Sequence, residues 1–334
     1  MKVFLITEGG EHIGLGHITR CSSLYQAFEE KGIAAELLIN GDADIEAFIE
    51  CKRYRLFDWL ADRDRLFGII DGSNIIIVDS YLADKSLLEK ISDVARIPVY
   101  IDDNKRLDYP RGIVVNIGVY ADGLNYPERE NVVYFTGLKY ATVRKEFWHV
   151  QDRKVRKTLS SVMLTFGGND ASDVTTKVLT FLKGEYPMIR RVVVIGMGFH
   201  TLNKVELLRD ENTEIIYHPD ATGMKEVMIN SDVAISAGGQ TLYELAATGT
   251  PTIGICVADN QEFNLRGWEN IGFIKNAGWY DDNRFFERLR KHIDRLADYS
   301  DRKGRSDIGR RCVDGQGSRR LVDIIVGATT NAAN

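Results

Sequence analysis

Residues 9–21 hold four glycines and two histidines, His12 and His17, between an apolar run and a stretch of helical spacing. Glycine lets backbone N–H groups approach a ligand closely, and the N-terminus of the following helix presents unpaired donors and a partial positive charge. An imidazole ordinarily titrates near neutral pH and can accept a proton there. The stretch therefore predicts a site for an anionic substrate, with His17 at the chemistry and substrate contacts from Gly14, Gly16 and Arg20.

This glycine stretch differs from the common phosphate-binding patterns. The dinucleotide pattern G-x-G-x-x-G needs a third glycine where this chain has Thr19, and a Walker lysine is missing. A tight turn that carries a solvated histidine is the alternative interpretation. For His12, functional and structural roles stay equally open.

Acidic residues follow two of the predicted strands in the first half of the chain. Asp79 ends a buried apolar run and precedes Tyr81, whereas Asp103 follows the next predicted strand. Ligands of parallel sheets bind beyond the carboxyl ends of the strands, so we expect these groups to join His17, with Asp79 or Asp103 orienting the imidazole. The adjacent Asp102 and Asp103 also suit a metal-binding pair, but an Asx turn fits at least as well. We predict no metal and no cofactor.

A second glycine-rich constellation lies in the other half of the chain. A predicted strand ends at Ser236, two glycines make the turn, and a helix begins at Gln240 or Thr241 and directs its N-terminus at a ligand, which suits a diphosphate. Glu244, one turn into that helix, can accept hydrogen bonds from two adjacent hydroxyls, as on a ribose; a solvated carboxylate at the helix start is the alternative. The predicted nucleotide-binding residues are Ser236, Gly238, Gly239, Gln240, Thr241, Glu244, Asn260, Gln261 and, from an earlier glycine turn, Gly167, Gly168 and Asn169.

Short apolar runs alternate with helical patterns along the whole chain, which predicts βαβ units and largely parallel sheets. We expect strands at 2–7, 34–40, 74–79, 98–101, 112–115, 132–136, 161–166, 191–195, 213–217, 232–236 and 250–256. Helices are expected after residue 17 and at 42–67, 83–94, from 172, and at 202–210, 220–230, 241–248 and 260–271. A charged hinge at 148–157 separates two α/β domains that face a cleft.

Length and composition limit the class of protein. A chain of 334 residues predicts two domains, which we place at 1–150 and 151–315, with a terminal helix at 316–327 that returns to the first domain. A net charge of −5 argues against nucleic acid as a partner. The four cysteines are widely spaced, and we expect neither a signal peptide nor a membrane span, so free thiols in the cytoplasm are predicted. The sequence leaves the oligomeric state open.

Several motifs, in this order, resemble one known family. They are 14–21 (Gly-Leu-Gly-His-x-x-Arg-Cys), 79–81 (Asp-Ser-Tyr), 102–103 (Asp-Asp), 137–147, 166–170 (Phe-Gly-Gly-Asn-Asp), the block 236–261 and 314–317. Together they resemble the PseG family, the UDP-2,4-diacetamido-2,4,6-trideoxy-β-L-altropyranose hydrolases of the pseudaminic acid pathway. The resemblance extends from residue 1 to about residue 326.

The resemblance implies a GT-B architecture similar to that of MurG-type glycosyltransferases, with two Rossmann-like domains. It implies cleavage of a UDP-sugar at the anomeric carbon, with inversion, with release of UDP and without a metal. In the family the histidine that matches His17 acts on the attacking water, the tyrosine that matches Tyr81 lines the site, and Met224 would border the uracil. Family members commonly have histidine where this chain has Ser80, and this departure bears on which sugar is bound.

Two other functions stay open on the sequence alone. An inverting glycosyltransferase would use the same UDP-sugar donor site, with a sugar or lipid as acceptor in place of water. A protein that binds a nucleotide sugar without turning it over would need the same cradle and no catalytic histidine.

Overall fold

The computed structural model describes residues 1–10, 13–42, 45–46, 49, 51–168, 170–196, 198–199 and 201–331. His12 and Asn169, both singled out above, lie outside the described residues. The chain forms two compact units, one of Met1–Lys145 with Gly315–Asn334 and one of Glu146–Asp314. We call them the N-terminal unit and the C-terminal unit and describe each by itself.

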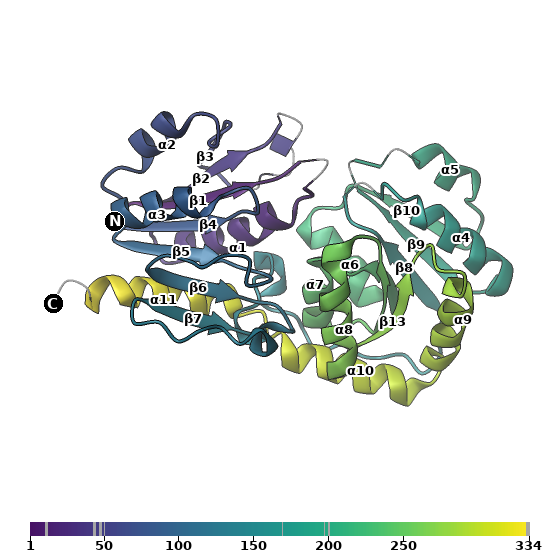
Figure 1. The fold of residues 1–334 in the computed structure, drawn as a ribbon. Coiled ribbons are helices and arrows are strands. Elements are labelled where there is room, and N and C mark those ends of the chain that lie inside the picture. The colour runs from purple at the N-terminus through teal and green to yellow at the C-terminus, as the bar shows by residue number, and fades with distance from the viewer. Residues whose placement is uncertain are drawn as a thin grey trace. The chain divides into compact units, whose positions relative to one another are not determined.

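The N-terminal unit is built on a seven-stranded sheet in which all paired strands are parallel (Figure 1). The strand order is β3-β2-β1-β4-β5-β6-β7. The central strands β1 and β4 are buried along their whole length, which explains why their sequences are mostly apolar and do not alternate between apolar and polar residues. The strands are β1 Val3–Glu8, β2 Ala35–Asn40, β3 Tyr54–Leu56, β4 Ile75–Asp79, β5 Ile97–Ile101, β6 Gly112–Asn116 and β7 Val132–Thr136.

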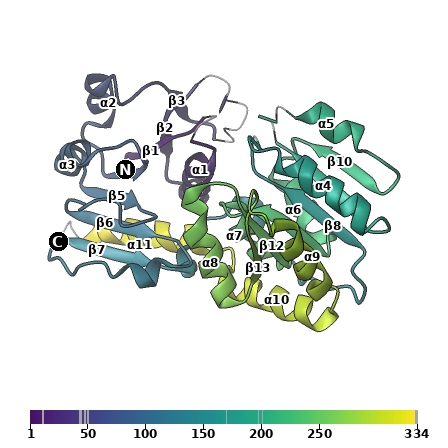
Figure 2. The same ribbon diagram turned by 45° about the vertical axis from the view of Figure 1, so that its right-hand side comes forward.

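Helices cover the sheet of the N-terminal unit. They are α1 Gly16–Glu30, α2 Arg63–Ile70, α3 Lys85–Val94 and α11 Gly317–Asn331, with single 3-10 turns at Ala121–Leu124 and Leu138–Tyr140. The last helix, α11, comes from the far end of the chain and lies beside α1 and β5 in Figures 1 and 2. Ser318 on α11 hydrogen-bonds Ser23 on α1 at 2.6 Å, and both side chains are fully buried. The C-terminal segment thus completes the core of the N-terminal unit.

The C-terminal unit repeats the plan with a six-stranded parallel sheet of order β10-β9-β8-β11-β12-β13. Its apolar core packs α4 and α9 against the central strands. The strands are β8 Ser161–Thr165, β9 Arg190–Ile195, β10 Thr213–Tyr217, β11 Val233–Ala237, β12 Thr252–Cys256 and β13 Ile274–Trp279. The helices are α4 Val174–Glu185, α5 Leu202–Leu207, α6 Ala221–Asn230, α7 Thr241–Thr248, α8 Glu262–Ile271, α9 Phe285–Leu296 and α10 Tyr299–Cys312, with a 3-10 turn at Asp259–Gln261.

Both units therefore have Rossmann-like strand orders, and the predicted α/β class is confirmed. In each sheet the order reverses once, between β1 and β4 in the first and between β8 and β11 in the second. The loops that leave the carboxyl ends of strands at such a switch point form the crevice where α/β folds bind ligands. Each unit has its glycine turns at this place.

The predicted helix over 42–67 is wrong for most of its described part. Tyr54–Leu56 forms edge strand β3, because exposed Arg55 stands between partly buried Tyr54 and Leu56 and gives the alternation of a strand. A helix begins only at Arg63, where the Asp62 carboxylate accepts the backbone N–H of Arg65 as an N-cap. Strand β13 was not predicted, because glycine and polar residues interrupt its apolar pattern.

Two further expectations can be compared with the structure. All four cysteines lie in the described part of the chain and none forms a disulfide, as their spacing predicts. Among the described residues, no helix is long and apolar enough to cross a membrane.

The docking of α11 leads to a test of stability. A Cβ on Gly317 would lie 2.1 Å from the Ala141 carbonyl oxygen, whereas a Cβ on Gly327 of the same helix meets nothing within 4 Å. We expect Gly317→Ala to destabilise the protein by about 1–3 kcal/mol through forced backbone displacement. Gly327→Ala should be neutral or stabilising by up to about 1 kcal/mol. Urea unfolding followed by circular dichroism measures both, and equal effects of the two substitutions would contradict the packing described here.

Candidate active site

The switch point of the N-terminal unit places α1 beside the end of β4. β1 pairs with β4 in register Thr7 with Asp79, so the turn after β1 leads directly past the Asp79 carboxylate. That turn is closed by backbone hydrogen bonds between Gly10 and Gly14, and Gly14 has φ of +80°, a conformation that favours glycine. Helix α1 starts immediately afterwards at Gly16.

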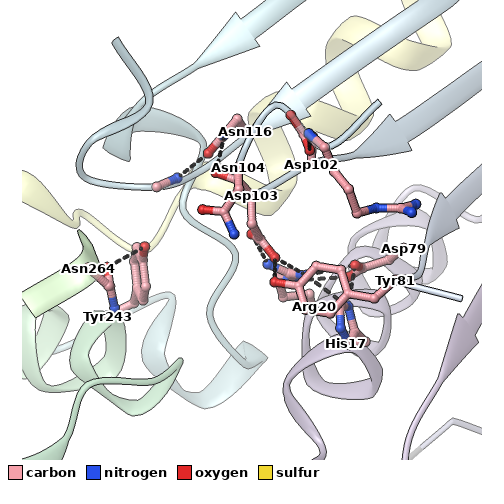
Figure 3. Close-up of polar contacts among 12 residues, drawn as sticks. His17, Arg20, Asp79, Tyr81, Asp102, Asp103, Asn104, Asn116, Tyr243 and Asn264 are labelled. Atoms are coloured by element: carbon pink, nitrogen blue, oxygen red, sulfur yellow. Dashed lines mark hydrogen bonds and ion pairs between the residues drawn. The ribbon is translucent and has the colours of Figure 1, made fainter. Parts of the chain in front are cut away.

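Four charged or titratable side chains meet above this sheet edge (Figure 3). His17 Nδ1 lies 2.6 Å from Asp79 Oδ1. Arg20 donates to Asp79 from Nε at 2.9 Å and from Nη2 at 2.7 Å, and to Asp103 from Nη1 at 2.5 Å and from Nη2 at 3.1 Å. His17, Arg20 and Asp79 are 5%, 7% and 0% exposed. One guanidinium therefore binds two carboxylates, one of which also holds the histidine.

The tautomer of the His17 ring follows from a choice between two contacts of Nδ1. Asp79 Oδ1, at 2.6 Å, can only accept a hydrogen bond from Nδ1, whereas Arg20 Nη2, at 2.9 Å, can only donate one to it. We assign Nδ1 as the donor to Asp79, because a hydrogen bond to a carboxylate is the shorter and stronger one. The assignment leaves the lone pair of Nε2 free to accept a proton.

The charges of this cluster support one another. Burial acts to lower the pKa of Arg20, but the carboxylates of Asp103 and Asp79 outweigh it and hold that pKa well above its ordinary value. Burial likewise acts to raise the pKa of Asp103, and the Arg20 charge and its hydrogen bonds reverse the shift and lower it. Arg20 and Asp103 therefore favour the charged form in each other.

Tyr81 closes one side of the cluster. Its hydroxyl donates to Asp103 Oδ2 at 2.5 Å, and its ring meets the imidazole of His17 edge-on, with the ring centroids 4.5 Å apart. Burial and the neighbouring Asp103 charge raise the pKa of Tyr81 well above its ordinary value, so the phenol stays protonated. Tyr81 is thus a hydrogen-bond donor and a wall for the imidazole.

The neighbouring Asp102 does not face this cluster. Its carboxylate accepts the backbone N–H groups of Lys105 and Arg106 at 2.9 and 3.1 Å, as in an Asx turn, and the hydroxyls of Tyr109 and Tyr126. Of the two interpretations of the Asp pair, these contacts favour the turn. Within the described part of the chain, no three His, Cys, Asp or Glu side chains are grouped as a metal site would need.

In the C-terminal unit, the loop after β11 packs closely against helix α8 at Gly238. A Cβ on Gly238 would lie 2.7 Å from Leu265 Cγ and 2.9 Å from Gln261 Cβ, so only glycine lets the loop lie on α8. Gln261 Oε1 accepts a hydrogen bond from the backbone N–H of Gly238 at 3.1 Å, and Asn264 Nδ2 donates one to the Gly238 carbonyl oxygen at 2.7 Å. Asn264 Oδ1 in turn accepts the Tyr243 hydroxyl at 3.1 Å (Figure 3). These contacts fix the loop at the start of α7.

The other predicted residues of this unit lie at different depths. Ser236 is fully buried, and its hydroxyl donates to the Ala237 carbonyl at 3.1 Å, so it lies beneath the loop. Met224 and Glu244 are buried on α6 and α7, at 7% and 3% exposed. The more exposed of the predicted residues are Gly167 and Gly168 in the turn after β8, Gly239, Gln240 and Thr241 at the start of α7, and Asn260 and Gln261.

Three residues that contact these predicted groups escaped the sequence analysis. Glu8 accepts hydrogen bonds from the loop that carries Tyr81, whereas Asn264 and Tyr243 support the Gly238 loop. Glu8 is the last residue of an otherwise apolar strand, and Asn264 is a lone amide on the buried side of α8. For Glu8 and Asn264, the sequence signal was a polar residue at a position where the strand or helix pattern predicts a buried apolar side chain.

Comparison with known proteins first defines the fold. No family model matches the chain. The crystal structure of MurG from Acinetobacter baumannii is 13% identical and superposes with a TM-score of 0.67 over 98% of this chain and 100% of that one. This likeness and the two parallel sheets establish a GT-B fold, as the motifs predicted.

Curated relatives then confirm the resemblance to the PseG family. The Helicobacter pylori pseudaminic acid cytidylyltransferase and UDP-2,4-diacetamido-2,4,6-trideoxy-β-L-altropyranose hydrolase is 23% identical over 83% of this chain and 48% of its own length. The spore coat polysaccharide biosynthesis protein SpsG of Bacillus subtilis is 22% identical over 97% of this chain and 98% of its own. The chain spans about half the length of two of the curated relatives it matches, the H. pylori protein included.

The shared guanidinium predicts a large cost for its removal. Arg20→Met leaves the buried Asp79 and the partly buried Asp103 without their cation, and we expect a loss of about 3–5 kcal/mol in the free energy of unfolding at pH 7. Arg55→Met is the matched control, because Arg55 pairs with Glu36 at a half-exposed site and should cost less than about 1 kcal/mol. Urea titrations of both variants measure the costs, and a similar loss in each would contradict the coupling.

The lowered pKa of Asp103 predicts a pH dependence of stability. A carboxylate whose folded pKa is depressed contributes stability above the ordinary pKa of about 3.9, and this contribution is lost as the pH falls through the folded value. We therefore expect the stability difference between the wild type and Asp103→Asn to be largest near neutral pH and to shrink in acid. Urea midpoints at pH 7, 5 and 3 measure it, and a difference independent of pH would be the contrary result.

Proposed function

We propose that this protein is a nucleotide-sugar hydrolase that cleaves the anomeric C–O bond of a UDP-linked diacetamido-trideoxyhexose with inversion and releases UDP and the free sugar. The observation that carries the proposal is the buried pair of His17 and Asp79, whose Nδ1–Oδ1 contact of 2.6 Å leaves Nε2 available as a base. The resemblance to the H. pylori protein, whose name includes this hydrolase activity, supplies the substrate class.

The proposed reaction uses His17 as the general base. Nε2 removes a proton from water, the water oxygen bonds to the anomeric carbon, and the bond from that carbon to the β-phosphate oxygen breaks with its electron pair on UDP. Attack from the face opposite the leaving group inverts the anomeric centre. Asp79, fixed by Arg20, stabilises the imidazolium that forms.

Tyr81 and Asp103 restrict the base in this proposal. The Tyr81 ring packs against the imidazole in a T-shaped contact, and its hydroxyl donates to Asp103. Rotation of the His17 ring away from the water would have to displace this aromatic contact. Orientation of a base in this way removes part of the entropic cost of the reaction.

The C-terminal unit is the proposed nucleotide site. The N-terminus of α7 and the glycine turns after β8 and β11 offer backbone N–H groups to the diphosphate, which neutralise the charge of the leaving group without a metal. Glu244 is proposed to accept the ribose hydroxyls, and Met224 to border the base. Gln261 and Asn264 then act by holding the Gly238 loop in place.

An inverting glycosyltransferase is the second candidate, because it would need the same donor site and base and would differ only in the acceptor. The GT-B fold is compatible with both. The small size of water as an acceptor suits the nearly buried His17, which is 5% exposed.

The test is release of UDP without any acceptor. We expect the purified protein to release UDP from a UDP-diacetamido-trideoxyhexose, with an inverted anomeric proton in the NMR spectrum of the fresh product, and to leave GDP- and CMP-sugars intact. His17→Phe should lower kcat by about 10²–10⁴-fold with little change in UDP binding, because only the base is lost. Near-wild-type turnover of that variant would contradict the mechanism.

The controls separate the alternatives. UDP release that begins only when a sugar or lipid acceptor is added would establish a transferase. Tight binding of the sugar nucleotide by calorimetry with no turnover under either condition would establish a binding protein and refute the proposal.

A further inference from the structure

Glu8 is a carboxylate in a place where burial makes one costly. It is the last residue of β1, it is 0% exposed, and it follows five residues of a buried strand. An ionised carboxylate removed from water must be compensated by hydrogen bonds or a cation. Its contacts therefore indicate what it is there to hold.

The Glu8 carboxylate accepts hydrogen bonds from one short loop, the segment after β4. Oε1 accepts the backbone N–H of Tyr81 at 2.7 Å and that of Leu82 at 3.2 Å, and Oε2 accepts the hydroxyl of Ser80. Since β1 and β4 are neighbours in register, the end of one strand clamps the loop that leaves the other.

Ser80 extends the clamp into the loop. Besides donating to Glu8, its oxygen accepts the N–H groups of Leu82 and Ala83 at 3.0 and 2.9 Å. Arg106 also holds this loop, because its Nη2 donates hydrogen bonds to the backbone carbonyl oxygens of Ser80 at 3.0 Å and Ala83 at 2.9 Å. The backbone on both sides of Tyr81 is therefore fixed, although the Tyr81 side chain itself is 38% exposed.

We propose that Glu8 and Ser80 form a positioning pair for the reaction, which sets the ring of Tyr81 against His17 and its hydroxyl on Asp103. The inference rests on the proposed function, because it treats His17 as the reacting group. It also gives Ser80 a role, because the Ser80 hydroxyl donates a hydrogen bond to the Glu8 carboxylate and the two side chains hold the loop together.

The chain offers a matched control for this inference. Ser73 and Ser80 flank β4 at its two ends, both are buried at 4% and 5% exposed, and each donates a hydrogen bond. Ser73 donates to the Ile70 carbonyl, at the edge of the sheet opposite the site. Ser73→Ala therefore removes a comparable buried bond without touching the loop of Tyr81.

The first measurement reports the position of Tyr81 independently of turnover. With 3-fluorotyrosine at position 81, we expect the fluorine NMR resonance to shift or broaden in Glu8→Gln and in Ser80→Ala, and to stay unchanged in Ser73→Ala. An unchanged resonance in both loop variants, or an equal change in Ser73→Ala, would overturn the inference.

The second measurement connects this position to the chemistry. We expect Glu8→Gln and Ser80→Ala each to lower kcat for UDP release by about 10–100-fold with little change in KM, and Ser73→Ala to keep the wild-type kcat. In a Tyr81→Ala background, Glu8→Gln should cost little more, because its effect passes through Tyr81. Additive losses, or a moved resonance with unchanged kcat, would overturn the inference.

The two proposals fail in different ways. If the wild-type protein releases no UDP from any sugar nucleotide, with or without acceptor, the proposed function is refuted and the fluorine resonance alone decides whether Glu8 and Ser80 position Tyr81. If the wild type turns over and the loop variants match it, only the positioning pair is refuted.

Discussion

The bidentate pairing of Arg20 with Asp79 and Asp103 is the interaction on which the site depends. The fully buried Asp79 and the partly buried Asp103 lie close together, and the guanidinium between them offsets the cost of holding two carboxylates in one site. Asp79 can then accept from His17 as a carboxylate, which sets the ring tautomer. Asp103 can accept a hydrogen bond from the Tyr81 hydroxyl, which keeps the Tyr81 ring against the imidazole. Loss of the guanidinium would remove both of these roles at once.

The fold brings these groups together with very short connections. His17 and Arg20 are three residues apart on α1 and so lie on one helix face. Asp79 ends β4, and Asp103 is the second residue after the neighbouring strand β5. Because β1 feeds α1 at the switch point of the sheet, the helix face and the strand ends meet without a long loop. In the C-terminal unit the switch point lies between β8 and β11, and the Gly238 loop and α7 follow β11 there.

Much of this arrangement was accessible from the sequence because it follows from local pattern. Apolar runs that end in Asp79 or precede Asp103 mark strand ends, and a glycine turn before a helix marks the position of His17. Which carboxylate orients the imidazole was not accessible, because it depends on strand order and register, and the structure places Asp79 there. Glu8 was missed since its partners are 72 to 74 residues away. Edge strand β3 was absorbed into a helix because three residues are too few for periodicity to register.

The proposed mechanism depends on Asp79 holding the His17 ring with a proton on Nδ1 and a free lone pair on Nε2. Nitrogen-15 NMR of the histidine side chains, with His17 assigned by comparison with His17→Phe, measures this directly. At a pH where the ring is neutral, we expect a protonated Nδ1 and an unprotonated Nε2 for His17, and loss of that preference in Asp79→Asn. A proton on Nε2, with Nδ1 accepting from Arg20, would contradict it.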